Sequence, residues 1–189
     1  GKMDYDGIVV QLPLAPDLDI EAVLNTVPPL KDIDVLGKVA KESYATGKIN
    51  RTPPVAKAVL EILEAHNVKL KGKKIVVAGQ GRLVGEPVSM MFRRMKVPHD
   101  TIDINTSEKK KLEFFKNADI IISGMGVPHF IKKDMIKKGL VLIDAGTSEQ
   151  GGKTVGDVDP SCESMASLLT PVPGGLGPIT VVSVLRNLL

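Results

Sequence analysis

The feature that most constrains the fold of this chain is a regular alternation of short apolar runs and helix-like segments after residue 72. Four runs rich in β-branched residues are each bounded by Gly, Asp or Asn: 74–79, 100–104, 119–124 and 140–146. Runs this short and apolar are typical of buried parallel strands. Helix-like segments lie between them: 87–95, 107–118 and 132–139. This order predicts an α/β fold with a doubly wound parallel sheet, a Rossmann-like domain.

The first part of the chain lies outside this repeat. Residues 6–14 read as another strand, and residues 18–27 as a short helix with an Asp able to cap it. Residues 52–68 predict a longer helix, with Thr52 ahead of two prolines as its start. A lone strand needs neighbours to pair with. We therefore expect the N-terminal strand to be the last piece of a domain that begins before this chain.

Composition narrows the classes of function. Of the 189 residues, 43% are hydrophobic and 25% charged, which is ordinary for a folded soluble protein, and no apolar run approaches the ~20 residues of a membrane span. Lysines come in short runs with 3% aromatics, so we expect a solvated surface and no nucleic-acid partner. The three histidines are far apart, so no metal site is expected. The single cysteine, Cys162, indicates no disulfide and favours the cytoplasm.

A glycine-rich loop follows the first strand of the repeat. Gly79, Gly81 and Gly85 stand between a predicted strand and a predicted helix. A pyrophosphate needs close access to the backbone there, and the helix N-terminus supplies N–H donors and a positive dipole end. The spacing G-x-G-x-x-x-G is one residue longer than the common fingerprint, so a tight turn that only joins sheet to helix is the alternative. The context favours a dinucleotide site.

The predicted cofactor site continues along the same edge of the sheet. Asp103 follows the second strand, close to the spacing of about 20 residues at which a carboxylate holds an adenosine ribose. Such a carboxylate favours NAD over NADP. The alternatives are an Asp103 that points to solvent, or a ribose held by Thr106 and its neighbours. The remaining predicted cofactor residues follow the third and fourth strands: Gly124, Gly146 and Thr147.

Five strings in this order resemble the bifunctional methylenetetrahydrofolate dehydrogenase/cyclohydrolase family: GIVVQLPL, KDID, TPP, GQGRLVGEP and TPVPGGLGPIT. The similarity covers nearly the whole chain, and the first and last strings together are highly specific to the family. It implies an N-terminal α/β domain and a C-terminal dinucleotide-binding domain. In that family a reduced folate lies against the nicotinamide in the cleft between the two domains.

The resemblance implies a domain organisation and a reaction. Residues 1–54 are expected to be a remnant of the N-terminal folate-binding domain, residues 55–170 the NAD(P)-binding domain, and residues 171–189 a bridging loop and a helix that returns to the first domain. The implied activity is oxidation of 5,10-methylenetetrahydrofolate with NAD or NADP, then hydrolysis of the methenyl product to 10-formyltetrahydrofolate. Family members are usually homodimers. The alternative function is a non-catalytic dinucleotide-binding module.

The resemblance implies site residues at the positions that match the motifs of the family. Gln11 matches the glutamine near the reacting end of the folate, and Asp34 the aspartate that holds the pterin ring, so both are catalytic and substrate-binding candidates. Pro13 is also expected to contact the substrate, and Asp32 to anchor a turn. The matched positions on the cofactor loop are Gly79, Gly81, Arg82, Val84, Gly85 and Pro87.

Two departures from the family pattern limit this transfer. Many NADP-using members place Arg and Ser after the first glycine to help hold the 2′-phosphate, where this chain has Gln80 and Gly81; Arg82 and Lys109 are candidate substitutes. The family's catalytic lysine lies in a Tyr-x-x-x-Lys motif upstream of VQLPL. Here that pattern occurs after KDID, so Lys48 is not expected to be catalytic. We therefore expect a fragment or a natural truncation, with little cyclohydrolase activity of its own.

The stretch PVPGGLGPIT is either a loose connector or a rigid loop that touches a ligand. Three prolines restrict its backbone, and its glycines let the main chain pass close to a flat ligand. Pro178 is expected to open the final helix. With the resemblance, this loop becomes the bridge between cofactor and folate, through Pro171, Pro173, Gly174, Gly175, Gly177 and Pro178.

Overall fold

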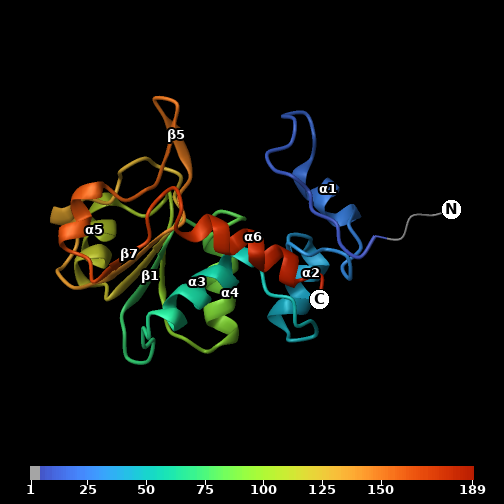
Figure 1. The fold of residues 1–189 in the computed structure, drawn as a ribbon, viewed down its shortest axis with the longest axis horizontal. Coiled ribbons are helices and arrows are strands. Elements are labelled where there is room, and N and C mark those ends of the chain that lie inside the picture. Colours follow the sequence, from blue (N-terminus) through green and yellow to red (C-terminus); the bar gives the residue numbers. More distant parts are fainter. Residues whose placement is uncertain (1–4) are drawn as a thin grey trace.

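The computed structural model describes residues 5–189 and contains a five-stranded parallel sheet with helices on both faces (Figure 1). The sheet order is β2-β1-β3-β4-β7. The strands are β1 (Ile75–Ala78), β2 (Asp100–Ile102), β3 (Ile120–Ser123), β4 (Val141–Asp144) and β7 (Leu168–Leu169). The doubly wound α/β prediction is confirmed. The two-residue edge strand β7 had not been predicted.

Alternate residues of each central strand face opposite layers of the core. In β1, Ile75 and Val77 pack with helices α3 (Pro54–Ala65), α4 (Gly85–Arg94) and α6 (Leu176–Arg186), which cover one face. Val76 and Ala78 pack on the other face with α5 (Glu108–Asn117). Both faces of the strands are therefore buried, which explains why their sequences are apolar throughout.

The helices confirm most of the sequence prediction. α1 (Ile20–Thr26) begins after Asp19, whose side chain accepts a hydrogen bond from the backbone N–H of Ala22. α3 begins two residues later than expected, because Pro53 is its N-cap and Thr52 caps nothing. α6 begins at Leu176, so Pro178 is its third residue rather than its first.

Two predicted elements are wrong. Residues 6–14 form no strand, and Ile8 makes only an isolated bridge to Asp32. One bridge cannot support an extended strand, so the apolar alternation there leaves Val9 exposed. Residues 132–139 contain only a 3₁₀ turn, η1 (Lys133–Met135), because the chain leaves the helical path on the way to Gly139.

Four further elements were not predicted from the sequence. α2 (Lys38–Ala45) is short and follows Gly37. β5 (Ser148–Gln150) and β6 (Lys153–Val155) form an antiparallel hairpin that projects from the sheet domain (Figure 1). The hairpin residues are mostly exposed and polar, so they lack the apolar signal of a strand. A further 3₁₀ turn, η2 (Pro160–Ser164), precedes β7.

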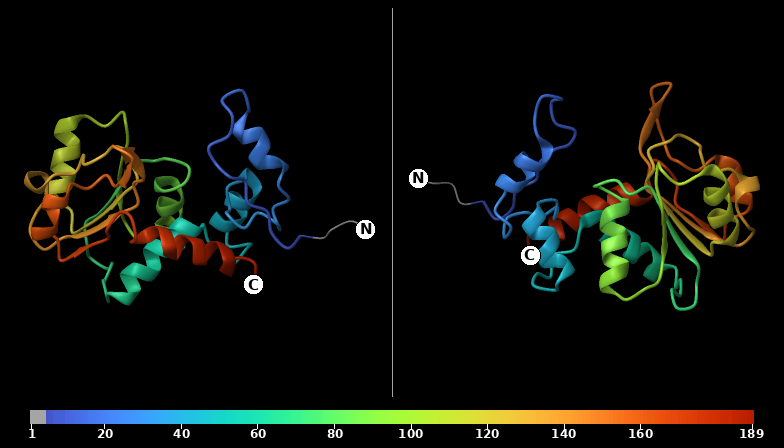
Figure 2. Two further views of the ribbon diagram at one scale, coloured as in Figure 1. Left: turned by 45° about the horizontal axis from the view of Figure 1, so that its top comes forward. Right: turned by 180° about the vertical axis from the view of Figure 1, so that it is seen from behind.

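The described part of the chain consists of an N-terminal segment, residues 5–52, and a sheet domain, residues 53–189. The C-terminal helix α6 runs from the sheet domain to the N-terminal segment (Figure 2). It packs along α3. Just beyond α6, the Asn187 side chain donates to the backbone carbonyls of Ile33 (2.7 Å) and Thr52 (2.9 Å). The backbone carbonyl of Asn187 accepts from the Arg51 side chain (2.9 Å). The N-terminal segment is thus held by the end of the chain. No helix within residues 5–189 is long and apolar enough to cross a membrane.

Candidate functional site

The candidate site begins where the strand order reverses. β1 pairs with β2 on one side and with β3 on the other, so the chain crosses from one half of the sheet to the other between them. Ligands of open α/β sheets bind outside the carboxyl ends of the strands at this point. Gly79 follows β1 there, and Gly124 follows β3.

Three predicted glycines allow the loop after β1 to pack against the loop after β3. A Cβ at Gly79 would collide with the carbonyl of Gly124, and one at Gly85 with the carbonyl of Gly79. A Cβ at Gly124 would collide with the side chain of Val84. Gly79 also has a φ of +85°, which favours glycine. Only glycine fits these positions without moving the backbone.

Gly81 has a different environment. A Cβ there would meet nothing within 4 Å, so the loop leaves open space beside its backbone. α4 begins a few residues later with no side chain capping its N-terminus. Its first residues include Gly85 and the buried Pro87. An uncapped helix N-terminus beside open backbone is the environment that a pyrophosphate requires.

A pocket of about 490 Å³ joins three of the predicted segments. Leu83 and Val84 of the glycine loop form one side, residues 144–147 after β4 another, and residues 171–178 a third, with Val55, Thr154 and Thr180 also lining it. Predicted site residues that the pocket brings together are Val84, Gly146, Thr147, Pro171, Pro173, Gly174, Gly175, Gly177 and Pro178. The stretch PVPGGLGPIT therefore lines a pocket opposite the glycine loop.

The loop at 171–178, whose last three residues are the first turn of α6, is held in shape by its own backbone. The N–H of Gly175 donates to the carbonyl of Pro171 (2.9 Å), and a Cβ at Gly175 would crowd that carbonyl. Gly174 has a φ of +99°. At its start, the Thr170 hydroxyl accepts from the backbone N–H of Asp144 (2.7 Å). The loop is thus anchored to the end of β4 and has a defined conformation.

Two buried aspartates organise the loops around the pocket, and sequence reasoning missed both. The Asp144 carboxylate accepts from the backbone N–H groups of Gly146 (2.9 Å) and Val158 (2.9 Å). Burial raises the pKa of Asp144, while these backbone hydrogen bonds oppose the shift and the charge of Asp157 adds to it. The only sequence signal was a pair of strings, IDAG and GDVDP, in which Asp stands among small residues.

Asp157 is the second of these aspartates. It accepts from the Ser123 hydroxyl (2.7 Å) and from the backbone N–H groups of Met125 (2.7 Å) and Val127 (2.9 Å). Its carboxylate also occupies the space where a Cβ on Gly146 would lie. Gly146 is therefore constrained by the aspartate network as well as by its place in the pocket.

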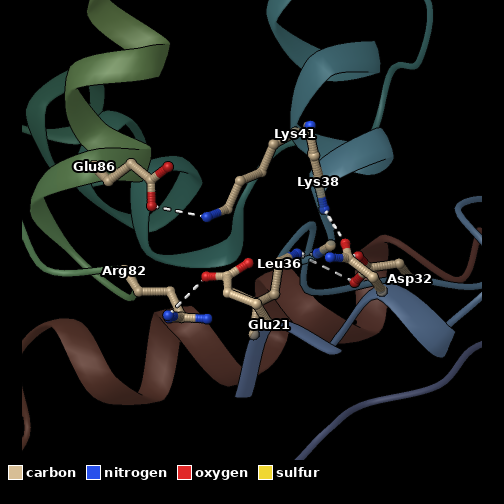
Figure 3. Close-up of polar contacts among 9 residues, drawn as sticks. Glu21, Asp32, Leu36, Lys38, Lys41, Arg82 and Glu86 are labelled. Carbon is tan, nitrogen blue, oxygen red and sulfur yellow. Dashed lines mark hydrogen bonds and ion pairs between the residues drawn. The ribbon is translucent and has the colours of Figure 1, made fainter. Parts of the chain in front are cut away.

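Arg82 lies at the junction with the N-terminal segment. Figure 3 shows its guanidinium turned toward Glu21 of α1 (2.8 Å), and Lys41 of α2 turned toward Glu86 of α4 (2.8 Å). The Nη2 nitrogen of Arg82 makes the contact with Glu21, whereas its Nη1 nitrogen is buried with no hydrogen-bond partner among residues 5–189. These side chains line a charged cavity of about 470 Å³. Arg82 thus joins the glycine loop to the N-terminal segment.

Asp103 and Thr106 form a turn after β2. The Asp103 carboxylate accepts from the backbone N–H groups of Asn105 (2.9 Å) and Thr106 (3.1 Å) and from the Thr106 hydroxyl (3.1 Å). The Gly79 N–H donates to the carbonyl of Ile102 (2.8 Å), the residue just before Asp103. Both predicted residues therefore lie beside the glycine loop at the carboxyl edge of the sheet.

The predicted folate residues lie in the N-terminal segment, outside the lining of the 490 Å³ pocket. Gln11 and Pro13 are exposed, and the Gln11 amide donates to the carbonyl of Leu12 (3.1 Å). Asp32 is buried and accepts from the N–H of Gly37 (2.8 Å), so it anchors a turn as expected. Asp34 is half-buried, and burial followed by the charge of Asp32 raises its pKa to about 6.

The sequence also predicted no metal site and no catalytic role for Lys48. Within residues 5–189, no group of three or more His, Cys, Asp or Glu side chains is placed to hold a metal ion. Cys162 is buried, and burial, with the charges of Asp159 and Asp134, raises the pKa of its thiol to about 11. Lys48 follows α2 on the surface, with Tyr44 buried in the core behind it.

Comparisons with known proteins identify what this chain is similar to. A family model described as "Tetrahydrofolate dehydrogenase/cyclohydrolase, NAD(P)-binding domain" matches residues 53–189. The bifunctional protein FolD of Mycoplasmopsis synoviae is 42% identical over 98% of this chain and 68% of its own length. The FolD of Aquifex aeolicus is 41% identical over 98% of this chain and 64% of its own length. The chain thus spans about two thirds of these relatives.

Solved structures agree with the fold. The crystal structure of the FolD enzyme from Campylobacter jejuni matches with a TM-score of 0.89 and 31% identity, over 97% of this chain and 65% of that one. The Trypanosoma brucei enzyme, solved with NADP cofactor and an inhibitor, has the same TM-score of 0.89 and 34% identity, over 97% of this chain and 65% of that one.

Proposed function

The chain belongs to the tetrahydrofolate dehydrogenase/cyclohydrolase family, and we propose that it takes part in the oxidation of 5,10-methylenetetrahydrofolate with NAD or NADP. The observation that carries the proposal is the pocket of about 490 Å³ between the glycine loop and the loop at 171–178. Its position at the switch point of the sheet is where α/β proteins bind dinucleotides.

The residues present fit a dinucleotide cofactor. Open space beside Gly81, together with the uncapped N-terminus of α4, accommodates a pyrophosphate. Gly174 and Gly177 leave open space on the facing loop, so a flat ring can approach the main chain. The bound nicotinamide would supply a hydride acceptor. The protein's contribution to that transfer is alignment of the two reactants.

The proposed substrate is a reduced folate, held between the N-terminal segment and the loop at 171–178. Asp34 is assigned to the pterin ring, since a half-buried carboxylate accepts hydrogen bonds from ring N–H groups. Gln11 and Pro13 are assigned to the reacting end of the substrate. Oxidation gives the 5,10-methenyl product, whose hydrolysis to 10-formyltetrahydrofolate needs a water molecule and acid–base assistance. In the hydrolysis of the methenyl product, Gln11 would help to orient the reacting groups.

Three further assignments belong to this proposal. Residues 1–54 belong to the folate-binding domain, residues 55–170 bind the cofactor, and residues 171–189 bridge them. The packing of α6 on α3 and the hydrogen bonds of Asn187 to Ile33 and Thr52 support that bridge. We also propose a homodimer in the cytoplasm, on the basis of the family resemblance and of a single, buried cysteine.

Cofactor binding is tested by thermal unfolding with NAD or NADP. Millimolar cofactor is expected to raise the melting temperature, since a ligand that binds only the folded state stabilises it. The variant Gly81→Val would fill the open space beside the loop and should remove the shift while the chain still folds. Gln150→Val, at the exposed end of strand β5, is a control for an added valine at a surface position where the backbone accepts it. No shift with either cofactor would contradict the proposal.

A further inference from the structure

The end of β2 lies directly beside the glycine loop. The sheet register pairs Ala78 with Ile102, and the Gly79 N–H donates to the carbonyl of Ile102 (2.8 Å). Asp103, the next residue, therefore lies at the carboxyl edge of the sheet next to the loop that would hold the pyrophosphate. In dinucleotide-binding folds this position faces the adenosine ribose. The chemistry of Asp103 then decides which ribose fits.

The Asp103 carboxylate is fixed in place. One oxygen, Oδ1, accepts from the N–H groups of Asn105 (2.9 Å) and Thr106 (3.1 Å) and from the Thr106 hydroxyl. The Thr106 hydroxyl in turn accepts from the backbone N–H of Asp103 (3.0 Å). The structure shows no hydrogen bond to the other oxygen, Oδ2, from any residue in 5–189. A preorganised carboxylate with one unused oxygen can accept from ribose hydroxyls.

Three cations of the glycine loop and of the first turn of α5 have partners in the structure. Lys111 pairs with Glu108 at the start of α5 (2.7 Å), and Lys110 lies over the ring of Phe114. Arg82, on the glycine loop, pairs with Glu21 of α1 (2.8 Å). Glu108, at the start of α5, is a second carboxylate in this part of the chain. Among residues 5–189, the cationic groups of the glycine loop and of this turn of α5 with no partner in the structure are Lys109 and the Nη1 nitrogen of Arg82.

We propose that Asp103 makes this site select NAD over NADP. The ribose 2′-hydroxyl of NAD is a hydrogen-bond donor, which a carboxylate satisfies. The 2′-phosphate of NADP has acceptor oxygens and a negative charge, which the same carboxylate repels. Gln80 and Gly81 leave the glycine loop without a cation before Arg82. The inference rests on the proposed dinucleotide site and adds its selectivity.

The test is calorimetric titration of NAD and NADP into the full chain and into Asp103→Asn. The amide keeps an oxygen for the N–H groups of Asn105 and Thr106, so the turn is preserved while the charge is lost. We expect the wild type to bind NAD at least about tenfold more tightly than NADP, and Asp103→Asn to reduce that ratio about tenfold, mainly through tighter NADP binding. Asp100→Asn removes an equal charge from the opposite end of β2 and should leave the ratio unchanged.

Each other result has a defined meaning. Equal binding of the two cofactors by the wild type, tighter NADP binding, or an unchanged ratio in Asp103→Asn overturns the selectivity and leaves the dinucleotide site standing. A selective loss of NADP binding in Arg82→Gln would show that Arg82 leaves Glu21 to hold the phosphate, and would also overturn it. No binding of either cofactor overturns the proposed function itself. If Asp103→Asn unfolds, Asp103→Ser, whose hydroxyl can also accept in the turn, replaces it.

Discussion

Asp34, which we propose to hold the pterin ring, is a side chain that lowers the stability of the fold at neutral pH. Its carboxyl is half-buried beside the buried Asp32, and its pKa rises from 3.8 to about 6. The folded state therefore keeps this proton to a higher pH than the unfolded chain does. The stabilising effect of protonation is complete below the unfolded pKa of 3.8 and is lost as the pH rises through about 6. At neutral pH the ionised side chain destabilises the fold.

The substitution Asp34→Asn is expected to raise the melting temperature near pH 7, because it removes a charge that burial and Asp32 both disfavour. The gain should shrink as the pH is lowered from about 7 to about 4.5, since the wild-type carboxyl then becomes neutral in the folded state. Calorimetry across this range measures the effect. Asp100→Asn, at an exposed carboxylate, is the control. A gain that is constant with pH would show that ionisation of Asp34 is not its cause.

At the scale of elements, Asp157 ties the loop after β3 to the segment after β6. Its two oxygens accept from Ser123, Met125 and Val127. Asn at position 157 would replace one acceptor oxygen by an NH2 group, and that group would face an N–H or O–H donor of the loop after β3. Leaving a buried N–H group unsatisfied costs roughly 1–3 kcal/mol. The loop after β3 also carries Gly124, against which the glycine loop packs.

Asp157→Asn is therefore expected to lower the free energy of unfolding by about 1–3 kcal/mol and to loosen the loop after β3. Urea unfolding measures the first effect, and faster hydrogen exchange of the Met125 and Val127 amides measures the second. Asp159→Asn is the control, because Asn can still cap the 3₁₀ turn η2 through the Ser161 N–H. Unchanged protection of Met125 and Val127 in Asp157→Asn would contradict this role for the carboxylate.

The strands with the clearest sequence signal are the three whose burial is complete. The apolar runs of β1, β3 and β4 follow from a sheet covered on both faces, and the glycines after β1 from the close approach of two loops. Residues 6–14 carry a similar apolar pattern but make a single bridge, so the pattern alone was misleading. Strand identity depends on partners, which a local pattern does not contain.

The site residues divide in the same way. Glycines and prolines of the pocket were predictable because their backbone chemistry is local. Asp157 and Ser123 are far apart in the sequence, and their hydrogen bond follows from the fold rather than from any motif. The Arg82–Glu21 ion pair likewise joins the glycine loop to a helix of the N-terminal segment. Long-range polar contacts are therefore the part of the site that sequence reasoning missed.

At the scale of the whole molecule, apolar packing and two kinds of polar contact hold the N-terminal segment to the sheet domain. Val35 and Tyr44 belong to the same buried core cluster as α3, α4 and β1. Ion pairs join α1 to the glycine loop and α2 to α4, and such partly exposed pairs contribute about 0–1 kcal/mol each. The Asn187 amide is part-buried and donates to the backbone carbonyls of Ile33 and Thr52, so we expect it to help the two parts unfold together.

Asn187→Ala removes a donor shared by the carbonyl of Ile33, which precedes α2, and the carbonyl of Thr52, which precedes α3. We expect the N-terminal segment to unfold before the sheet domain in this variant, because the carbonyls of Ile33 and Thr52 lose their partner while α6 still packs on α3. Limited proteolysis should then cut within residues 5–51 faster than in the wild type, leaving residues 53–189 intact. Arg186→Gln is the matched control, since Arg186 pairs with Glu61 of α3 inside the sheet domain. Equal cleavage rates in Asn187→Ala and wild type would mean that the apolar packing and the ion pairs, rather than the C-terminus, hold the segment.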